Sequence, residues 1–305
     1  MSVTKFKQLK INQLILHSIL ILCMGSSAIA HAQNEVSVVN VTDNIKILMG
    51  RGGNIGIFTG DDGTFMIDDK FPDMTEEVVN AIKSAGGDIP KFLINTHWHG
   101  DHTGGNESFG TQGSVIVAHD NVRARMSVDN VIKAFDMNAP AAPAIALPMV
   151  TYDSVIRFHL NGDNLDVIHV PTAHTDGDSI VHFTNTNVVH AGDVFFNGFF
   201  PFIDTDHGGT LAGMIGGADQ LLAMTDDDTR IIPGHGPLAN KADLQKYRDM
   251  LVLAQERLAD LKSQGKSLSD VTAMQPLADL DAEWGQVIFS AEKWVGLIFD
   301  SIPAN

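Results

Sequence analysis

Apolar and polar residues alternate over several short segments in the first 120 residues, and this pattern predicts β-strands. The segments are residues 36–41, 45–48, 55–59, 64–68, 91–95 and 115–118. Turns rich in glycine and aspartate separate most of them. Similar runs return later and predict a second group of strands at residues 154–160, 165–170, 179–183 and 188–190.

Helical periodicity follows each group of strands. Apolar residues spaced three and four apart predict helices at residues 73–84, 121–135, 211–223, 242–262 and 281–299. Two groups of strands, each followed by helices, favour an α/β fold in which two sheets pack together and helices cover their outer faces. This is a four-layer αβ/βα sandwich. Residues 139–148 are rich in alanine and proline and are predicted to be an ordered connector or a lid over a pocket.

The first 32 residues have the composition of a secretory signal peptide. Three lysines form a basic start, an apolar run covers residues 11–24, and an Ala-x-Ala pattern ends the segment. A membrane anchor is disfavoured because the run is short for a span and no stop-transfer charges follow it. We expect a signal peptide over residues 1–32, a single folded domain over residues 33–305, and a periplasmic or secreted location.

The chain is acidic, with a formal net charge of −17 that becomes −20 when the three lysines of the signal segment are removed. Such a surface repels nucleic-acid phosphates and anionic lipid. We therefore expect no nucleic-acid partner and, after the signal peptide is removed, no association with the membrane. The expected partner is a small-molecule substrate. The sequence does not tell whether the protein forms oligomers. Cys23 is the only cysteine and lies in the signal segment, so the mature chain has no thiolate metal ligand.

Residues 96–102 read Thr-His-Trp-His-Gly-Asp-His and place three imidazoles and one carboxylate close together. His97 and His99 are two residues apart after a predicted strand, so an extended backbone puts both rings on one side. In a buried loop these polar groups would need partners, and neighbouring imidazolium groups would repel one another. A divalent cation satisfies both requirements, and nitrogen ligands with one hard oxygen suit zinc. The alternative is a solvated polar loop.

Three later loops each add one candidate ligand beside small residues. These are His174 in Pro-Thr-Ala-His, Asp193 in Ala-Gly-Asp and His235 in Pro-Gly-His-Gly. A lone loop histidine is more often a surface residue, so these positions carry weight only as an ordered set.

The ordered set of HxHxDH, a single histidine, Gly-Asp and Pro-Gly-His-Gly resembles the metallo-β-lactamase superfamily from about residue 44 to about residue 240. The resemblance implies the metallo-β-lactamase fold, with two Zn²⁺ per chain held at the open edge of the sandwich. The implied ligands are His97, His99 and His174 for the first ion, Asp101, His102 and His235 for the second, and Asp193 as the bridge. Asp68 matches a family aspartate and is expected to orient a ligand histidine.

The chemistry that the resemblance implies is hydrolysis. Two neighbouring zinc ions lower the pKa of a shared water from ~15.7 towards ~7, so that a metal-bound hydroxide forms at neutral pH. This hydroxide would attack a carbonyl or phosphoryl centre. Asp101 is the expected catalytic residue, because it could orient the nucleophile.

The residues around Asp193 give conflicting information on the substrate. Most true β-lactamases of the superfamily have cysteine or serine in place of Asp193, and many have a basic residue shortly after it, where this chain has Phe195, Phe196 and Asn197. Export and His102 as a second-ion ligand instead favour a β-lactamase-like enzyme. We therefore rank hydrolysis of a β-lactam or similar cyclic amide or ester first. Lactonase, phosphoesterase and thioesterase activities are the alternatives.

Other interpretations stay open. An iron-dependent dioxygenase shares the scaffold but is disfavoured by the complete second ligand set, and a binding module is disfavoured because no proposed ligand is missing. The phenylalanines of residues 195–202 fit core packing and an apolar substrate wall equally well. The polar loop at residues 204–209 is interpreted as a surface loop rather than as pocket lining.

Overall fold

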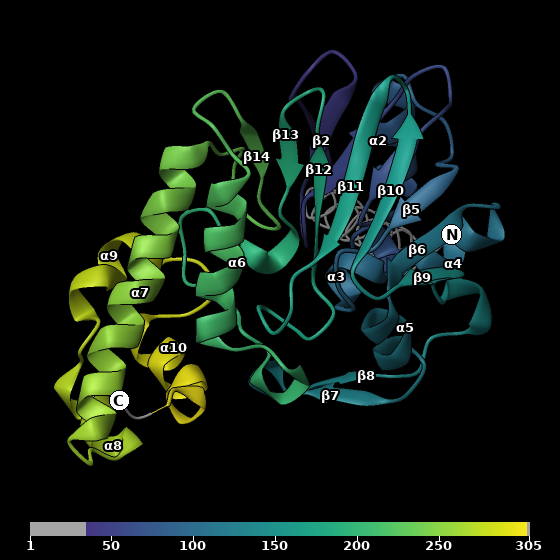
Figure 1. Cartoon of the computed structure of the whole chain (residues 1–305). Helices are drawn as coiled ribbons and strands as arrows, with labels where there is room; N and C mark the ends of the chain where they lie inside the picture. Colours follow the sequence, from purple (N-terminus) through teal and green to yellow (C-terminus); the bar gives the residue numbers. More distant parts are fainter. Residues whose placement is uncertain (1–34, 304–305) are drawn as a thin grey trace, which may run out of the picture.

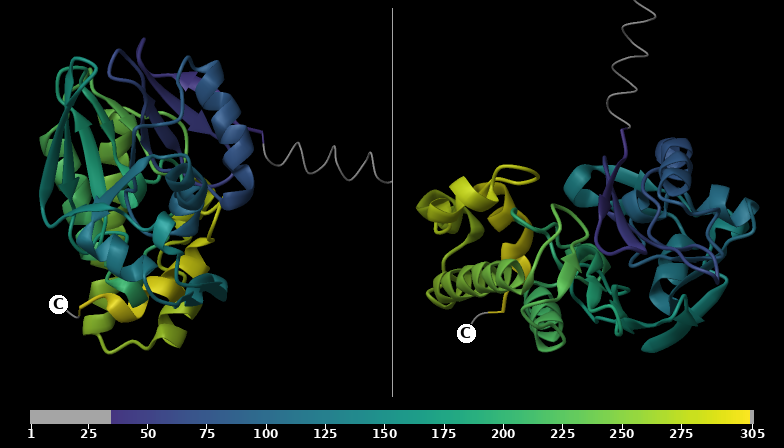
Figure 2. Two further views of the ribbon diagram at one scale, coloured as in Figure 1. Left: turned by 90° about the vertical axis from the view of Figure 1, so that its right-hand side faces the viewer. Right: turned by 90° about the horizontal axis from the view of Figure 1, so that it is seen from above.

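The computed structural model describes residues 35–303, in which two β-sheets pack face to face and helices cover their outer faces (Figures 1 and 2). The predicted signal peptide therefore lies outside the described residues. No helix among residues 35–303 is long and apolar enough to cross a membrane.

The first sheet has seven strands in the order β1-β2-β3-β4-β5-β6-β9, antiparallel up to β4 and parallel beyond it. Its strands are β1 (Ser37–Asn40), β2 (Ile45–Met49), β3 (Ile55–Phe58), β4 (Phe65–Ile67), β5 (Phe92–Ile94), β6 (Val115–His119) and β9 (Val150–Tyr152). The second sheet has five strands in the order β10-β11-β12-β13-β14, of which only the last pair is parallel. They are β10 (Val155–Leu160), β11 (Asp163–His169), β12 (Ser179–Phe183), β13 (Val188–His190) and β14 (Arg230–Ile232). A separate hairpin pairs β7 (Asn130–Ile132) with β8 (Met137–Ala139).

Helices of three or more turns cover the sheets, and shorter ones form the loops and the C-terminal region. The α-helices are α2 (Thr75–Ser84), α3 (Gly100–Thr103), α4 (Asn106–Thr111), α5 (Asp120–Met126), α6 (Leu211–Ala223), α7 (Lys241–Ser263), α8 (Leu268–Met274), α9 (Asp281–Trp284) and α10 (Ala291–Ile298). The 3-10 turns are η1 (Pro72–Met74), η2 (Lys133–Phe135), η3 (Ala144–Ala146), η4 (Gly192–Val194), η5 (Thr205–His207), η6 (Ala278–Leu280) and η7 (Phe299–Ser301).

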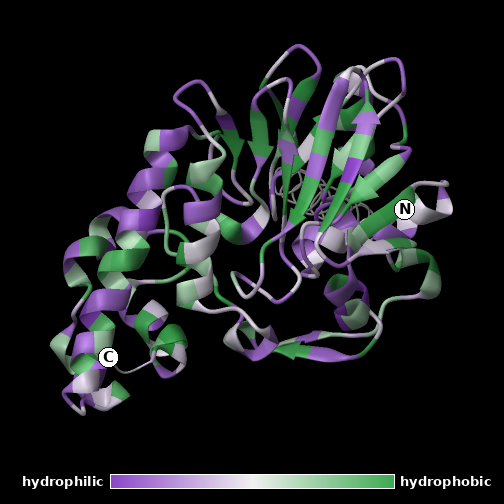
Figure 3. Ribbon diagram, in the orientation of Figure 1, coloured by the Kyte–Doolittle hydropathy of each residue, from purple (hydrophilic) through white to green (hydrophobic). Residues whose placement is uncertain are grey.

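Three buried apolar clusters correspond to the three interfaces of a four-layer sandwich. In β4, Phe65 and Ile67 face the second sheet, whereas Met66 faces α2 on the outside. In β12, Val181 packs between the sheets and Ile180 packs towards α6 and α7. This alternation follows from the two-residue period of a strand, and Figure 3 shows it as hydrophilic and hydrophobic bands along β10 and β11. The predicted αβ/βα sandwich is confirmed.

The predicted helix at residues 121–135 is wrong beyond Met126. The chain leaves α5 there and forms the β7–β8 hairpin, in which Ile132 is buried. The predicted helix at residues 281–299 is interrupted after Trp284, and the strands β9 and β14 were not predicted. Both missed strands have three residues, which is too short for alternation to be recognised.

Candidate metal centre

The HxHxDH segment connects β5 to α3 at the edge of the first sheet. His99 has an extended backbone and directly precedes α3, which brings Asp101 and His102 back towards His97. The ring centroids of His97 and His99 lie 4.9 Å apart, and those of His97 and His102 lie 4.3 Å apart. Thr103 Oγ1 donates to the His99 carbonyl over 3.1 Å and braces this turn.

Two groups of side chains meet at this edge, and both contain predicted ligands. In the first group, potential ligand atoms of His97, His99 and His174 all lie within 4.8 Å of one another. His99 Nδ1 is 2.8 Å from His174 Nε2. Because two imidazole lone pairs repel at this distance, a cation or proton between them is required.

The second group consists of Asp101, His102 and His235. His235 Nε2 lies 3.3 Å from His102 Nε2 and 3.3 Å from Asp101 Oδ2. His235 follows β14, the one strand of the second sheet that runs parallel to its neighbour. The two groups therefore draw on both sheets.

Asp193 lies between the two groups. Its Oδ2 is 3.4 Å from His174 Nε2 in the first group and 3.4 Å from His235 Nε2 in the second. This approach requires glycine at position 234, because a Cβ there would lie 2.0 Å from Asp193 Oδ1. The structure thus brings together all seven residues that the sequence predicted as ligands.

Hydrogen bonds on the far side of each ring fix which nitrogen faces the centre. His102 Nδ1–H donates to Asp68 Oδ2 over 2.7 Å, and His174 Nδ1–H donates to the Phe202 carbonyl over 2.8 Å. His99 Nε2–H donates to Asp204 Oδ2 over 2.9 Å. The other nitrogen of each of these three rings is thereby directed inward, as metal ligation requires. Asp68 occupies the orienting position expected from the sequence.

Burial keeps two of the imidazoles neutral. It lowers the pKa of His97 well below its usual range, with a further contribution from His102, and it lowers the pKa of His174 to about 4 against the opposing effect of Asp193. Neutral imidazole is the ligating form. His97 Nε2 is buried and has no hydrogen-bond partner among the described residues. A metal ion would satisfy it.

The two imidazoles of the second group, His102 and His235, favour the protonated form when no cation is present. Burial alone would lower the pKa of His235, but Asp193 and Asp101 raise it to about 9. For His102 the same carboxylates also outweigh burial and raise the pKa. Burial would raise the pKa values of Asp101 and Asp193, but His102 and His235 lower both. Five imidazole nitrogens and two carboxylates fit a pair of divalent cations, and zinc is the common occupant of such sets.

The interpretation of residues 204–209 as a surface loop is wrong. Asp204 and His207 are buried, and Asp204 Oδ2 accepts hydrogen bonds from both His99 Nε2 and His207 Nδ1, over 2.9 and 2.8 Å. The polar composition of the loop suggested exposure to solvent. Asp204 and His207 are instead buried, because they form hydrogen bonds within the protein. The Asp-x-x-His spacing was the one available indication.

The phenylalanine segment packs in the core, and two of its rings also lie against ligand histidines. Phe195 and Phe200 are fully buried in the core. Phe196 stacks on His235 with ring centroids 5.1 Å apart, and the Phe202 ring lies 5.5 Å from the rings of His99 and His174. Apolar rings therefore cover both ligand groups on one side.

Comparison with known proteins agrees with this geometry. Residues 48–235 match the family described as the metallo-beta-lactamase superfamily. The chain belongs to the metallo-β-lactamase superfamily. This is a superfamily of metal-dependent hydrolases, so the predicted class of enzyme is confirmed at the level of the family.

Two similar sequences are named hydroxyacylglutathione hydrolase. One, from Nitrosococcus oceani, is 27% identical over 190 residues, covering 60% of this chain and 62% of that protein. The other, from a Polaromonas species, is 26% identical over 155 residues, covering 48% of this chain and 49% of that protein. The matched segments thus span less than two thirds of either relative.

Similar solved structures confirm the metallo-β-lactamase fold. A metallo-β-lactamase from Pontibacter korlensis aligns with a TM-score of 0.57 and 18% identity over 72% of this chain and 99% of that one. The inverting sec-alkylsulfatase Pisa1 from a Pseudomonas species aligns with a TM-score of 0.67 and 16% identity over 89% of this chain and 51% of that one.

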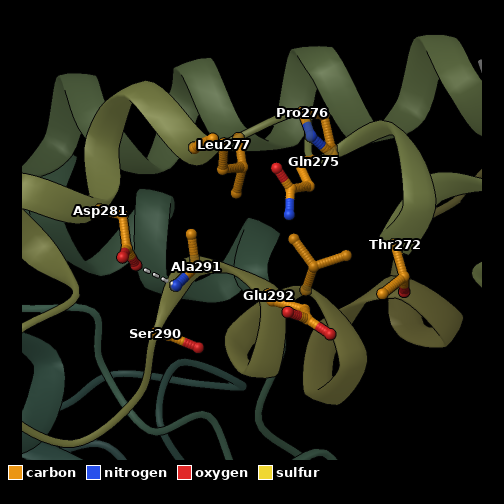
Figure 4. A pocket seen from close by; sticks show the side chains of 10 residues that line it. Thr272, Gln275, Pro276, Leu277, Asp281, Ser290, Ala291 and Glu292 are labelled. Carbon is orange, nitrogen blue, oxygen red and sulfur yellow. Dashed lines mark hydrogen bonds between the residues drawn. The ribbon is translucent and has the colours of Figure 1, made fainter.

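A hollow among the C-terminal helices lies outside this centre (Figure 4). Residues of α8, α9, α10 and the intervening loops line it, and none of the seven predicted ligands is among them. An Asp281 oxygen accepts a hydrogen bond from the Ala291 backbone beside it. This hollow therefore takes no part in the metal centre.

Proposed function

We propose that the chain is a dinuclear zinc hydrolase that cleaves carboxylic thioesters and esters. The observation that carries the proposal is the position of Asp193, whose Oδ2 lies 3.4 Å from a histidine nitrogen of each ligand group. A carboxylate placed in this way can serve two cations at once. Two zinc ions would supply a shared water of lowered pKa and an electrophile for the substrate carbonyl.

Each of the two ligand groups would hold one of the two zinc ions. His97, His99 and His174 would hold the first ion, and Asp101, His102 and His235 the second. The side chains of Asp101 and His235 are 23% and 18% exposed, whereas those of the other five are 6% exposed or less. Substrate would therefore approach beside Asp101, which can accept a proton from the attacking water and orient it.

Thioesters and esters now rank above β-lactams. Both sequence relatives are named hydroxyacylglutathione hydrolase, and the residue that would bridge the two ions here is Asp193. Phe195 and Phe196 follow it as buried apolar side chains, so this position offers no cation for a drug carboxylate. The structural likeness to β-lactamases, at 18% identity or less, supports the fold alone.

A hydrolysis panel with metal analysis tests this function. The chain would be purified without added metal, its zinc and iron measured, and its activity assayed on an acyl thioester, a carboxylic ester, a lactone, a cephalosporin, a carbapenem and a phosphodiester. We expect zinc, thioester and ester cleavage, loss of activity with a chelator, and recovery with zinc. Cleavage of the β-lactams or the phosphodiester alone would reject the substrate class. Iron with a requirement for dioxygen would reject hydrolysis.

We further propose that residues 1–32 direct export and that residues 33–305 act as one domain in the periplasm or outside the cell. The basic start and short apolar run of the segment support this. Cell fractionation followed by N-terminal sequencing of the mature protein tests it. A cytosolic protein with an intact N-terminus would refute export.

A further inference from the structure

Exposed apolar side chains gather on one short segment. Among residues 35–303, eleven large hydrophobic side chains are exposed, and seven of them lie between residues 128 and 150. This segment contains the β7–β8 hairpin, which lies below the two sheets in Figure 1. Such a concentration on one segment indicates a surface that contacts something apolar.

The strand register separates the two faces of the hairpin. Ile132 pairs with Met137, but Ile132 is buried whereas Met137 is 40% exposed, so only the Ile132 side of this face is directed towards the protein body. Val131 pairs with Asn138 on the opposite face. Phe135 lies at the tip, in the 3-10 turn η2.

The tip joins an aromatic cluster next to the metal centre. The ring of Phe135 lies 4.9 Å from that of Phe202 and 5.8 Å from that of Phe289. Phe202 in turn lies 5.5 Å from the rings of His99 and His174. Phe202 and Phe289 are each 7% exposed but Phe135 is 46% exposed, so the cluster has one open edge.

An exposed ion pair connects the tip of the hairpin to the loop at residues 204–209. Lys133 Nζ lies 2.6 Å from Asp206 Oδ1, in the loop that also carries Asp204. The lysine nearest to Phe135 in the chain is thus already paired. The tip also carries the exposed Asp136, but the cluster itself consists of three phenylalanine rings. A ligand that used this edge would gain contact area rather than a salt bridge.

We propose that the open edge of Phe135, Phe202 and Phe289 is a subsite for the apolar acyl chain of the substrate. The inference rests on the proposed function, since the acyl chain of the substrate would extend from a carbonyl held at the zinc pair. The two ring-to-ring steps from His99 through Phe202 to Phe135 measure 5.5 and 4.9 Å. Placed end to end, the two steps give an upper limit that corresponds to an extended acyl chain of about eight carbons. The substrate class is a medium-chain acyl thioester or ester.

Binding of alkyl hydroxamates from two to eight carbons tests the subsite directly. Calorimetry on the full chain, both zinc-loaded and metal-free, separates two effects. The zinc-dependent gain at fixed chain length reports the metal centre, and the gain per methylene reports the apolar subsite. We expect affinity to rise with each methylene, by at most about fourfold for a fully buried one.

Three variants localise the effect. Phe135→Ala should remove most of the gain per methylene, and Phe135→Leu should retain part of it. Val131→Ala is the matched control, because Val131 is 47% exposed on the same hairpin but lies on the face opposite to Ile132 and outside the phenylalanine cluster. It should keep the wild-type dependence.

The outcomes are distinct. Affinity that does not depend on chain length, or an unchanged dependence in Phe135→Ala, would overturn the subsite even if zinc strengthens binding. A chain-length dependence that is mostly lost in Phe135→Ala, partly kept in Phe135→Leu and unchanged in Val131→Ala would support it. If zinc adds nothing to hydroxamate affinity, the proposed zinc function fails, whereas the gain per methylene still decides the subsite.

Discussion

Asp204 is predicted to control the affinity of the first metal site without touching the metal. Its Oδ2 accepts from His99 Nε2 over 2.9 Å and from His207 Nδ1 over 2.8 Å, and its side chain is 3% exposed. These contacts hold the His99 ring with Nδ1 directed at His174. In Asp204→Asn the carboxylate charge is lost. One of the two oxygens becomes an amide nitrogen, which cannot accept a hydrogen bond from the ring of His99 or His207.

We expect Asp204→Asn to weaken zinc binding at this site by about 10- to 100-fold, the range found when a partner of a ligating histidine is removed. This equals roughly 1.4 to 2.7 kcal/mol of binding free energy. Competition with a chromophoric chelator measures it, and circular dichroism verifies the fold of the metal-free protein.

Asp206→Asn is the matched control. It removes the same charge from the same loop, but Asp206 pairs with the exposed Lys133 and is itself 38% exposed. Exposed ion pairs of this kind contribute little, so its zinc affinity should stay within about threefold of wild type. Equal affinities for wild type and Asp204→Asn would refute the orienting role.

Two further predictions concern the second group. Asp101→Ala should fold normally but lose about 10²- to 10⁴-fold in kcat on the best ester or thioester, because Asp101, at 23% exposed, is the more open of the two predicted carboxylate ligands; unchanged turnover would remove its catalytic role. Zinc binding to the second group should release protons, because the pKa of His235 is raised to about 9 and that of His102 is also raised, so both rings are protonated at neutral pH. Affinity there should rise with pH up to about 9. In the first group, His97 and His174 should contribute no protons between pH 6 and 8, because burial lowers their pKa values. Calorimetry in buffers of different ionisation enthalpy counts these protons, and equal release at both sites would contradict the assignment.

Local patterns revealed the ligands because four of them lie within one short segment and the others lie in loops beside small residues. The same patterns failed where tertiary contacts decide the structure. Ile132 and Phe135 continue the helical spacing of α5, yet the chain turns at Ser127 and buries Ile132 from a hairpin. Asp204 looked like a solvated loop residue because His99, its partner, lies 105 positions earlier in the chain. Sequence spacing contains no information on such a pairing.

Anomalous diffraction at the zinc absorption edge would test the central claim most directly, using crystals of protein purified without added metal. Two peaks should appear, one within about 2.0–2.1 Å of nitrogens of His97, His99 and His174 and the other bound by His102 and His235, with Asp193 between them. A single peak, an iron edge, or zinc bound away from Asp193 would contradict the account.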